Sequence, residues 1–156
     1  MTQTTDFRNQ YFQGKSCGLL TNKEASKLLG TPVATGGSVI ASDSPAGQTH
    51  PGQPRIDSCA HSSLKSSDGY IDVVVIDYGN KKNALLYYDQ EMAKTFPIES
   101  REPSALGEKL HYGGGVFYLL KNTLVIEVSA SKTPRTVEPD PEAFSREVIE
   151  TVVAKL

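Results

Sequence analysis

Three histidines are the side chains of this sequence best suited to metal binding or general base catalysis. His50, His61 and His111 fall on a predicted loop, strand and loop, and none of them has the close spacing of zinc ligands. The sequence therefore predicts no metal site and no bound cofactor. An alternative interpretation makes His61 or His111, with a nearby Asp or Ser, the catalytic base of a small hydrolase.

Other matches to catalytic patterns are incomplete. Ser62 and Lys65 form a Ser-x-x-Lys match, but it does not begin a helix and its companion motifs are missing. The glycines of residues 111–115 lack the Lys-Ser/Thr pair and the following helix that a phosphate-binding loop needs. Asp72 and Asp77 are five residues apart on a predicted strand and should point to opposite faces. We therefore assign no catalytic residue.

The charge balance and hydropathy argue against two large functional classes. Sixteen basic and 18 acidic residues are spread over the 156 positions, and the longest basic run is Lys81-Lys82. Nucleic-acid binding normally requires a concentrated basic patch, so no nucleic-acid partner is expected. No apolar run approaches the roughly 20 residues that cross a bilayer. We expect one domain over residues 15–156, preceded by a disordered or tag-derived segment, residues 1–14.

Helix boundary signals position the rest of the chain. Residues 21–24 (TNKE) form a capping box, and the short helix that follows should end at Gly30. A helical period runs from residue 80 to Pro97, and Asp140-Pro141 should begin a last helix. Strand signals lie between these helices. We predict strands at 56–61, 70–78, 116–120 and 124–129, loops at 41–55 and 132–141, and a mixed extended segment at 97–112.

The order of these elements predicts an α+β fold. Helices alternate with antiparallel runs of strands, so we expect an antiparallel sheet with helices packed on one face. The order also favours two similar α-β halves followed by a C-terminal helix, although no residue-level repeat supports the halves.

One face of the expected sheet is predicted to lie open. If Lys121-Asn122 is a two-residue turn, Leu119 pairs with Leu124 and Phe117 with Ile126, and this apolar face should lie under the helices. The opposite face mixes apolar, aromatic and acidic side chains, among them Leu120, Glu127 and Asp72, which is typical of protein contacts. Alternatively, the 97–112 segment or a second copy of the chain covers it. The predicted partner-binding residues are Tyr70, Val74, Ile76, Tyr78, Val116, Tyr118 and Val125.

A family resemblance covers most of residues 16–156. The segments 17–21 (CGLLT), 28–30 (LLG) and Pro32-Val33, with Ser58-Cys59 on a following strand, resemble the opening of the DUF3558-like small bacterial lipoprotein-type domains. Residues 105–110 (ALGEKL) are similar to their Gly-Leu-Gly-Asp-Ala segment, with Ala105 in place of the first Gly. The resemblance implies an exported, often lipid-anchored domain. Lys15-Ser16 is not a lipid-attachment context, so any anchor would lie upstream.

The resemblance also implies a disulfide between Cys17 and Cys59, the only two cysteines. A disulfide indicates an oxidising, extracytoplasmic compartment. The alternative is two buried free thiols in a cytosolic protein.

Three functions follow from these observations. The first is a non-catalytic exported domain that binds a protein or cell-envelope component through the open face of its sheet, with the membrane reached only through an upstream anchor. The second is the small hydrolase using His61 or His111. The third is a small-molecule or metal carrier.

Overall fold

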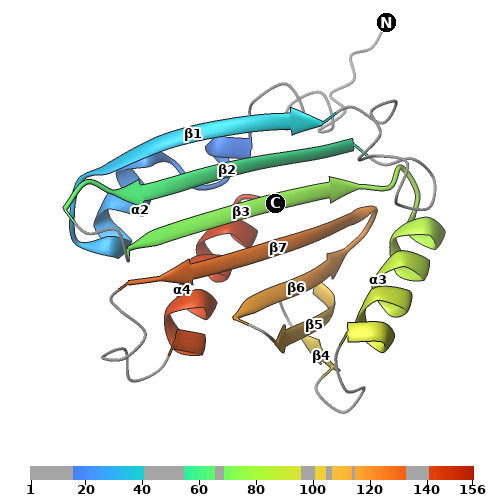
Figure 1. The fold of residues 1–156 in the computed structure, drawn as a ribbon. Helices are drawn as coiled ribbons and strands as arrows, with labels where there is room; N and C mark the ends of the chain where they lie inside the picture. The colour runs from blue at the N-terminus through green and yellow to red at the C-terminus, as the bar shows by residue number, and fades with distance from the viewer. Residues whose placement is uncertain are drawn as a thin grey trace, which may run out of the picture.

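The computed structural model describes residues 16–40, 55–65, 69–95, 101–104, 107–113, 115–132 and 141–156. Its strands form one antiparallel sheet in the order β1-β2-β3-β7-β6-β5-β4 (Figure 1). The predicted α+β class with a C-terminal helix is confirmed. The elements are η1 (Ser16–Gly18), α2 (Asn22–Leu29), β1 (Val33–Ile40), β2 (Arg55–Ser63), β3 (Tyr70–Asp77), α3 (Lys81–Thr95), β4 (Arg101–Ser104), β5 (Gly107–Gly113), β6 (Val116–Lys121), β7 (Leu124–Ser131) and α4 (Pro141–Val153).

The boundaries of α2 follow from its sequence, as predicted. The Glu24 backbone N–H donates to the Thr21 hydroxyl at 3.2 Å, and the Thr21 N–H donates to the Glu24 carboxylate at 2.9 Å. These two bonds satisfy backbone donors that have no partner at a helix start. Gly30 ends the helix with φ of 73°, a left-handed conformation that favours glycine.

The predicted second and last helices are also present. The Asn80 side chain accepts a hydrogen bond from the Asn83 N–H at 2.7 Å at the start of α3. The last helix begins at Pro141, as expected for a residue that lacks an N–H. Its predicted cap, Asp140, lies outside the described residues.

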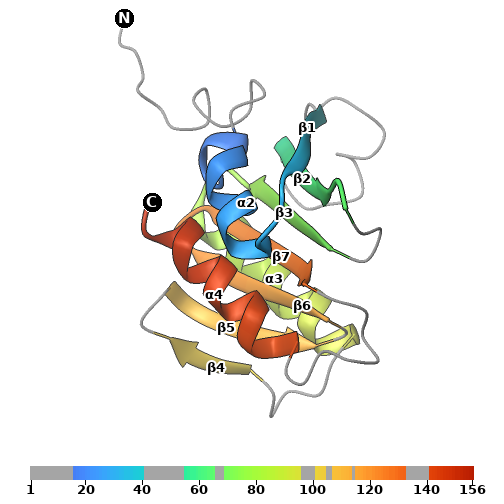
Figure 2. The same cartoon turned by 90° about the vertical axis from the view of Figure 1, so that its left-hand side faces the viewer.

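The sheet has two faces with different helical cover. We call the inner face the side of β3 that carries Ile71, Val73 and Val75, where α2 and α4 pack into the larger apolar cluster. The outer face is the opposite side, where Ala84 and Tyr88 of α3 pack with a smaller cluster. Figure 2 shows α2 and α4 together on one side of the sheet. The predicted packing on one face thus describes α2 and α4, whereas α3 lies on the other face.

The two expected halves explain why α3 packs on the outer face of the sheet, whereas α2 packs on the inner face. Each half runs from a helix into an antiparallel meander, and the last strands, β3 and β7, pair at the centre of the sheet. In the second half, α4 takes the inner face over β6 and β7. The helix α3 therefore contacts the same two strands from the outer face. The strands β6 and β7 are covered by α4 on the inner face and, over part of their length, by α3 on the outer face. The strands β1 and β2 have α2 on the inner face.

The pairing of β6 with β7 differs from the prediction by two residues. Leu119 pairs with Ile126 and Phe117 with Val128, while Lys121 pairs with Leu124. The two-residue turn is therefore Asn122-Thr123, and the φ of 55° at Asn122 belongs to its first central position. Because the shift is an even number of residues, every side chain keeps its predicted face.

Candidate functional site

The outer face carries a group of half-buried side chains beyond the end that α3 covers. We call it the open patch and define it by Tyr70, Asp72, Val74, Val116, Tyr118 and Glu127. The strand register places these residues side by side, since Val74 pairs with Glu127 on β7, and Glu127 pairs in turn with Tyr118 on β6. Figure 1 looks onto this face and shows α3 at one end of it. The patch is therefore continuous over three neighbouring strands.

Three of the predicted partner-binding residues are not accessible. Ile76, Tyr78 and Val125 lie on the predicted face but are only 3%, 3% and 1% exposed, because α3 packs over them. Their assignment to a contact surface is corrected: they form the small core under α3. The other four predicted residues, Tyr70, Val74, Val116 and Tyr118, are partly exposed and belong to the open patch.

The flank of the open patch consists of small residues that the sequence analysis did not single out. On β2, Ser58, Ala60 and Ser62 pair with Val74, Asp72 and Tyr70, respectively. On β1, Ala34 and Gly36 continue this side of the sheet. The apolar pattern of β1 is interrupted by Gly36-Gly37, so the sequence does not indicate a strand there. A partner could approach this flank closely because no bulky side chain stands on it.

Asp72 is one of the two half-buried acids of the open patch. Burial raises the pKa of its carboxyl group, and the nearby His61 partly offsets this effect. Asp77 lies on the inner side of β3, so the two carboxylates point to opposite faces, as predicted. Asp77 instead accepts a hydrogen bond from the Gly79 N–H at 2.8 Å. The charged form of Asp72 is thus held where solvation is incomplete.

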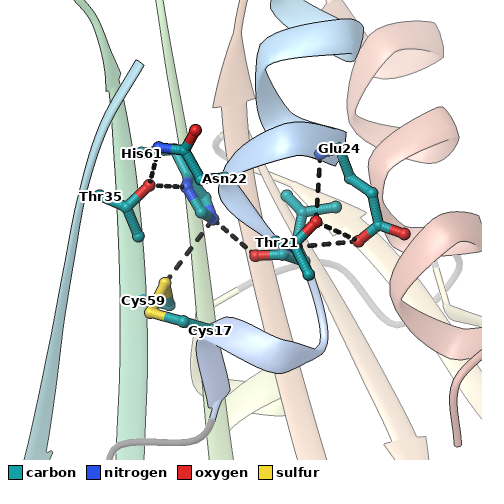
Figure 3. The surroundings of a disulfide bond; sticks show 8 residues. Cys17, Thr21, Asn22, Glu24, Thr35, Cys59 and His61 are labelled. Atoms are coloured by element: carbon teal, nitrogen blue, oxygen red, sulfur yellow. Dashed lines mark hydrogen bonds between the residues drawn. A yellow bond between two sulfur atoms is a disulfide. The ribbon is translucent and has the colours of Figure 1, made fainter. Parts of the chain in front are cut away.

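His61 lies on the inner face next to the start of α2 (Figure 3). Its Nε2 is 2.9 Å from the Leu20 carbonyl oxygen, which can only accept, so Nε2 carries the proton. Its Nδ1 is 2.8 Å from the Thr35 hydroxyl oxygen. This oxygen accepts a hydrogen bond from the Asn22 amide at 2.8 Å, and its own O–H can donate to Nδ1. The neutral ring therefore accepts at Nδ1, and burial lowers the pKa of His61.

This arrangement gives His61 a structural task. The ring is 0% exposed, and both nitrogens bond to groups of the protein itself. His111 is 1% exposed, pairs with Tyr118 across β5 and β6, and has its ring centroid 6.3 Å from that of Tyr118. Neither ring is placed to meet a substrate from solvent. His50 lies outside the described residues.

The predicted disulfide is present and lies beside the His61 ring. Cys17 of η1 and Cys59 of β2 are bonded, with their Cα atoms 5.1 Å apart. The Cys59 sulfur is 3.6 Å from Nε2 of His61. A Cβ atom at Gly37 would lie only 3.3 Å from the Cys17 sulfur, so glycine leaves room for the bond. The disulfide fixes η1 against the first two strands.

The described part of the chain holds neither a metal-binding cluster nor a membrane-spanning helix. No group of three or more His, Cys, Asp or Glu side chains there could hold a metal ion. Nor is any helix in these ranges long and apolar enough to cross a membrane.

The comparisons with known proteins concern the fold. No protein-family model matches this chain. No curated protein sequence matches it either. Among solved structures, the chain is similar to the extracellular domain of PknH from Mycobacterium tuberculosis, with a TM-score of 0.58 and 12% sequence identity over 88% of this chain and 92% of that one. At this identity the likeness shows a shared fold.

Proposed function

We propose that this protein is an extracytoplasmic binding or accessory domain that recognises a protein or cell-envelope component through the open patch. The observation that carries the proposal is the patch itself, in which tyrosines, valines and two carboxylates lie half-buried beside a flank of small residues. A mixture of aromatic, apolar and acidic groups on one continuous surface is typical of protein contacts.

Two observations support the extracytoplasmic location. The Cys17–Cys59 bond suits an oxidising compartment, where disulfides form and persist. The similar structure from Mycobacterium tuberculosis is that of an extracellular domain. We also propose that the chain belongs with the DUF3558-like domains, on the residues that resemble their opening segments.

The free-energy cost of ionising the half-buried Asp72 carboxyl group supports a binding role for the patch. Because burial raises its pKa, the ionised carboxylate destabilises the free protein at neutral pH. A cationic group of a partner that docked beside Asp72 and Glu127 would offset this cost. The positions of His61 and His111 favour binding over the hydrolase alternative, because both rings are buried.

A binding experiment with matched variants tests the proposal. Immobilised protein is incubated with a cell-envelope extract of its source, and retained components are identified. Tyr70→Lys and Val116→Lys place a charge within the patch, whereas Leu86→Lys places one on α3, where Leu86 is 45% exposed. We expect a component that the wild type and Leu86→Lys retain and the two patch variants lose, while all four proteins keep similar melting temperatures.

Two results would contradict this proposal. If the patch variants retain the same components as Leu86→Lys, the patch is not the contact surface. Turnover in a panel of esterase and phosphatase substrates that survives His61→Gln but not His111→Gln would favour a hydrolase instead.

A further inference from the structure

The two edges of the sheet are protected very differently. The strand β4 has four residues, including Pro103 and two charged residues, and its register shifts between Glu102 and Ser104. Proline, charges and irregular pairing are the usual means of keeping an edge from adding another strand. The strand β1 has eight residues, VATGGSVI, with no charge, no proline and an unbroken register. By these criteria β1 is an edge suited to pairing.

The hydrogen bonds show which backbone groups of β1 point outward. The Leu64 N–H donates to the Pro32 carbonyl at 2.9 Å, so the even-numbered residues of β1 exchange bonds with β2. The odd-numbered residues must then direct their N–H and C=O groups to the edge. The Val33 carbonyl fits this pattern, because it accepts a hydrogen bond from the Asn22 amide at 3.0 Å. The other odd-numbered residues of β1 are Thr35, Gly37 and Val39, and their backbone N–H and C=O groups point to the sheet edge.

These three residues are arranged symmetrically about Gly37. In an antiparallel pair of identical strands, a twofold axis normal to the sheet keeps each face on its own side, so paired residues must have the same parity. Centring the axis on Gly37 places Gly37 opposite its own copy and Thr35 opposite Val39, so all three outward residues take bonded positions. Gly36 then faces Ser38, and a Cβ at Gly36 would meet no atom within 4 Å among the described residues, apart from its two chain neighbours.

We propose that β1 pairs antiparallel with β1 of a second copy of this chain, with the twofold axis at Gly37. The pairing joins two sheets edge to edge and keeps α2 of both copies on the same side. It also makes the outer faces continuous, so the small-residue flanks of the two open patches adjoin. The inference is independent of what the open patch binds.

Sedimentation of the full chain from micromolar to near-millimolar concentration tests the pairing. We expect a monomer–dimer equilibrium. Val39→Pro removes one outward N–H and leaves the bonds of β1 to β2 in place, so it should give a monomer with a melting temperature close to that of the wild-type monomer. Ser62→Lys, on the neighbouring strand, is the control and should still dimerise. A wild type that stays monomeric, or a Val39→Pro variant that dimerises like the wild type, overturns the proposal.

A cross-link tests the register without proline. Ala34 and Ile40 lie far apart within one strand, but in the proposed dimer they face each other in a closely spaced pair. Ala34→Cys combined with Ile40→Cys should give a covalent dimer on a non-reducing gel, and Ala34→Cys alone should not. Absence of the covalent dimer, or a monomer that instead binds an added extended peptide along β1, rules out self-pairing.

Discussion

His61 shows how the surroundings of a residue decide its role. The sequence identified it as a candidate base or ligand, which is correct for an imidazole in general. Its partners, Leu20 and Thr35, come from segments 41 and 26 residues away, so no local pattern could reveal them. The structure assigns it instead to joining β1, β2 and the start of α2 beside the disulfide.

The lowered pKa of His61 predicts a pH-dependent stability. In the unfolded chain the ring titrates near pH 6.5, whereas burial keeps it neutral to lower pH in the fold. Below about pH 6.5 the unfolded state therefore binds more protons, and the free energy of unfolding should fall as the pH decreases toward the folded pKa. Above about pH 6.5 the His61 ring is neutral in both the folded and the unfolded state, so its stabilising effect is fully present.

Urea unfolding of the wild type and His61→Gln between pH 7.5 and pH 5 measures this effect. We expect the variant to be less stable at pH 7.5 and to lose less stability on acidification. Parallel pH profiles for the two proteins would show that other groups cause the dependence.

The raised pKa of Asp72 predicts a pH dependence of stability opposite in sign to that of His61. Its pKa is raised, so its charged form destabilises the fold above the folded pKa, and the effect disappears below the ordinary aspartate value near 3.9. Asp72→Asn should therefore unfold at a higher urea concentration than the wild type at pH 7, with the difference vanishing at pH 3. A destabilised Asp72→Asn at pH 7 would show that the carboxylate serves the fold.

At the level of elements, the helices could be predicted because their boundary signals are local. The capping box before α2 and Pro141 before α4 need only adjacent residues to act. The face of each strand could be predicted because side chains alternate along it. The register of β6 with β7 could not, since Asn122 suits either central position of a turn. The face of the sheet that α3 covers could not be predicted either, because it depends on where α4 packs.

The capping box gives the prediction for α2. Thr21→Ala removes the hydroxyl that accepts from the Glu24 N–H and should lower the free energy of unfolding by about 1 kcal/mol. For a chain of this size that corresponds to a melting temperature lower by about 2–4 °C. Thr21→Ser, which keeps the acceptor, is the control in a thermal melt. Equal losses in Ala and Ser variants would mean that the threonine methyl group, and not the cap, is responsible.

At the level of the whole molecule, the disulfide should contribute a large part of the stability. It closes a loop between residues 42 positions apart, for which chain entropy gives roughly 3 to 4 kcal/mol. The double variant Cys17→Ser/Cys59→Ser should therefore unfold at much lower urea concentration. Adding a reductant to the wild type should give a similar loss, and the reductant should not affect the double variant. Two alkylatable thiols in aerobically purified protein would contradict the bond itself.

The order of strands in the sheet also determines when the fold can be completed. β3 receives its second neighbour only from β7, where Ile71 pairs with Ala130, so one edge of β3 stays unpaired until β7 has been synthesised. Unpaired strand edges promote aggregation, and distant pairings form slowly. The central joint between β3 and β7 therefore exposes the growing chain to aggregation until β7 has been synthesised.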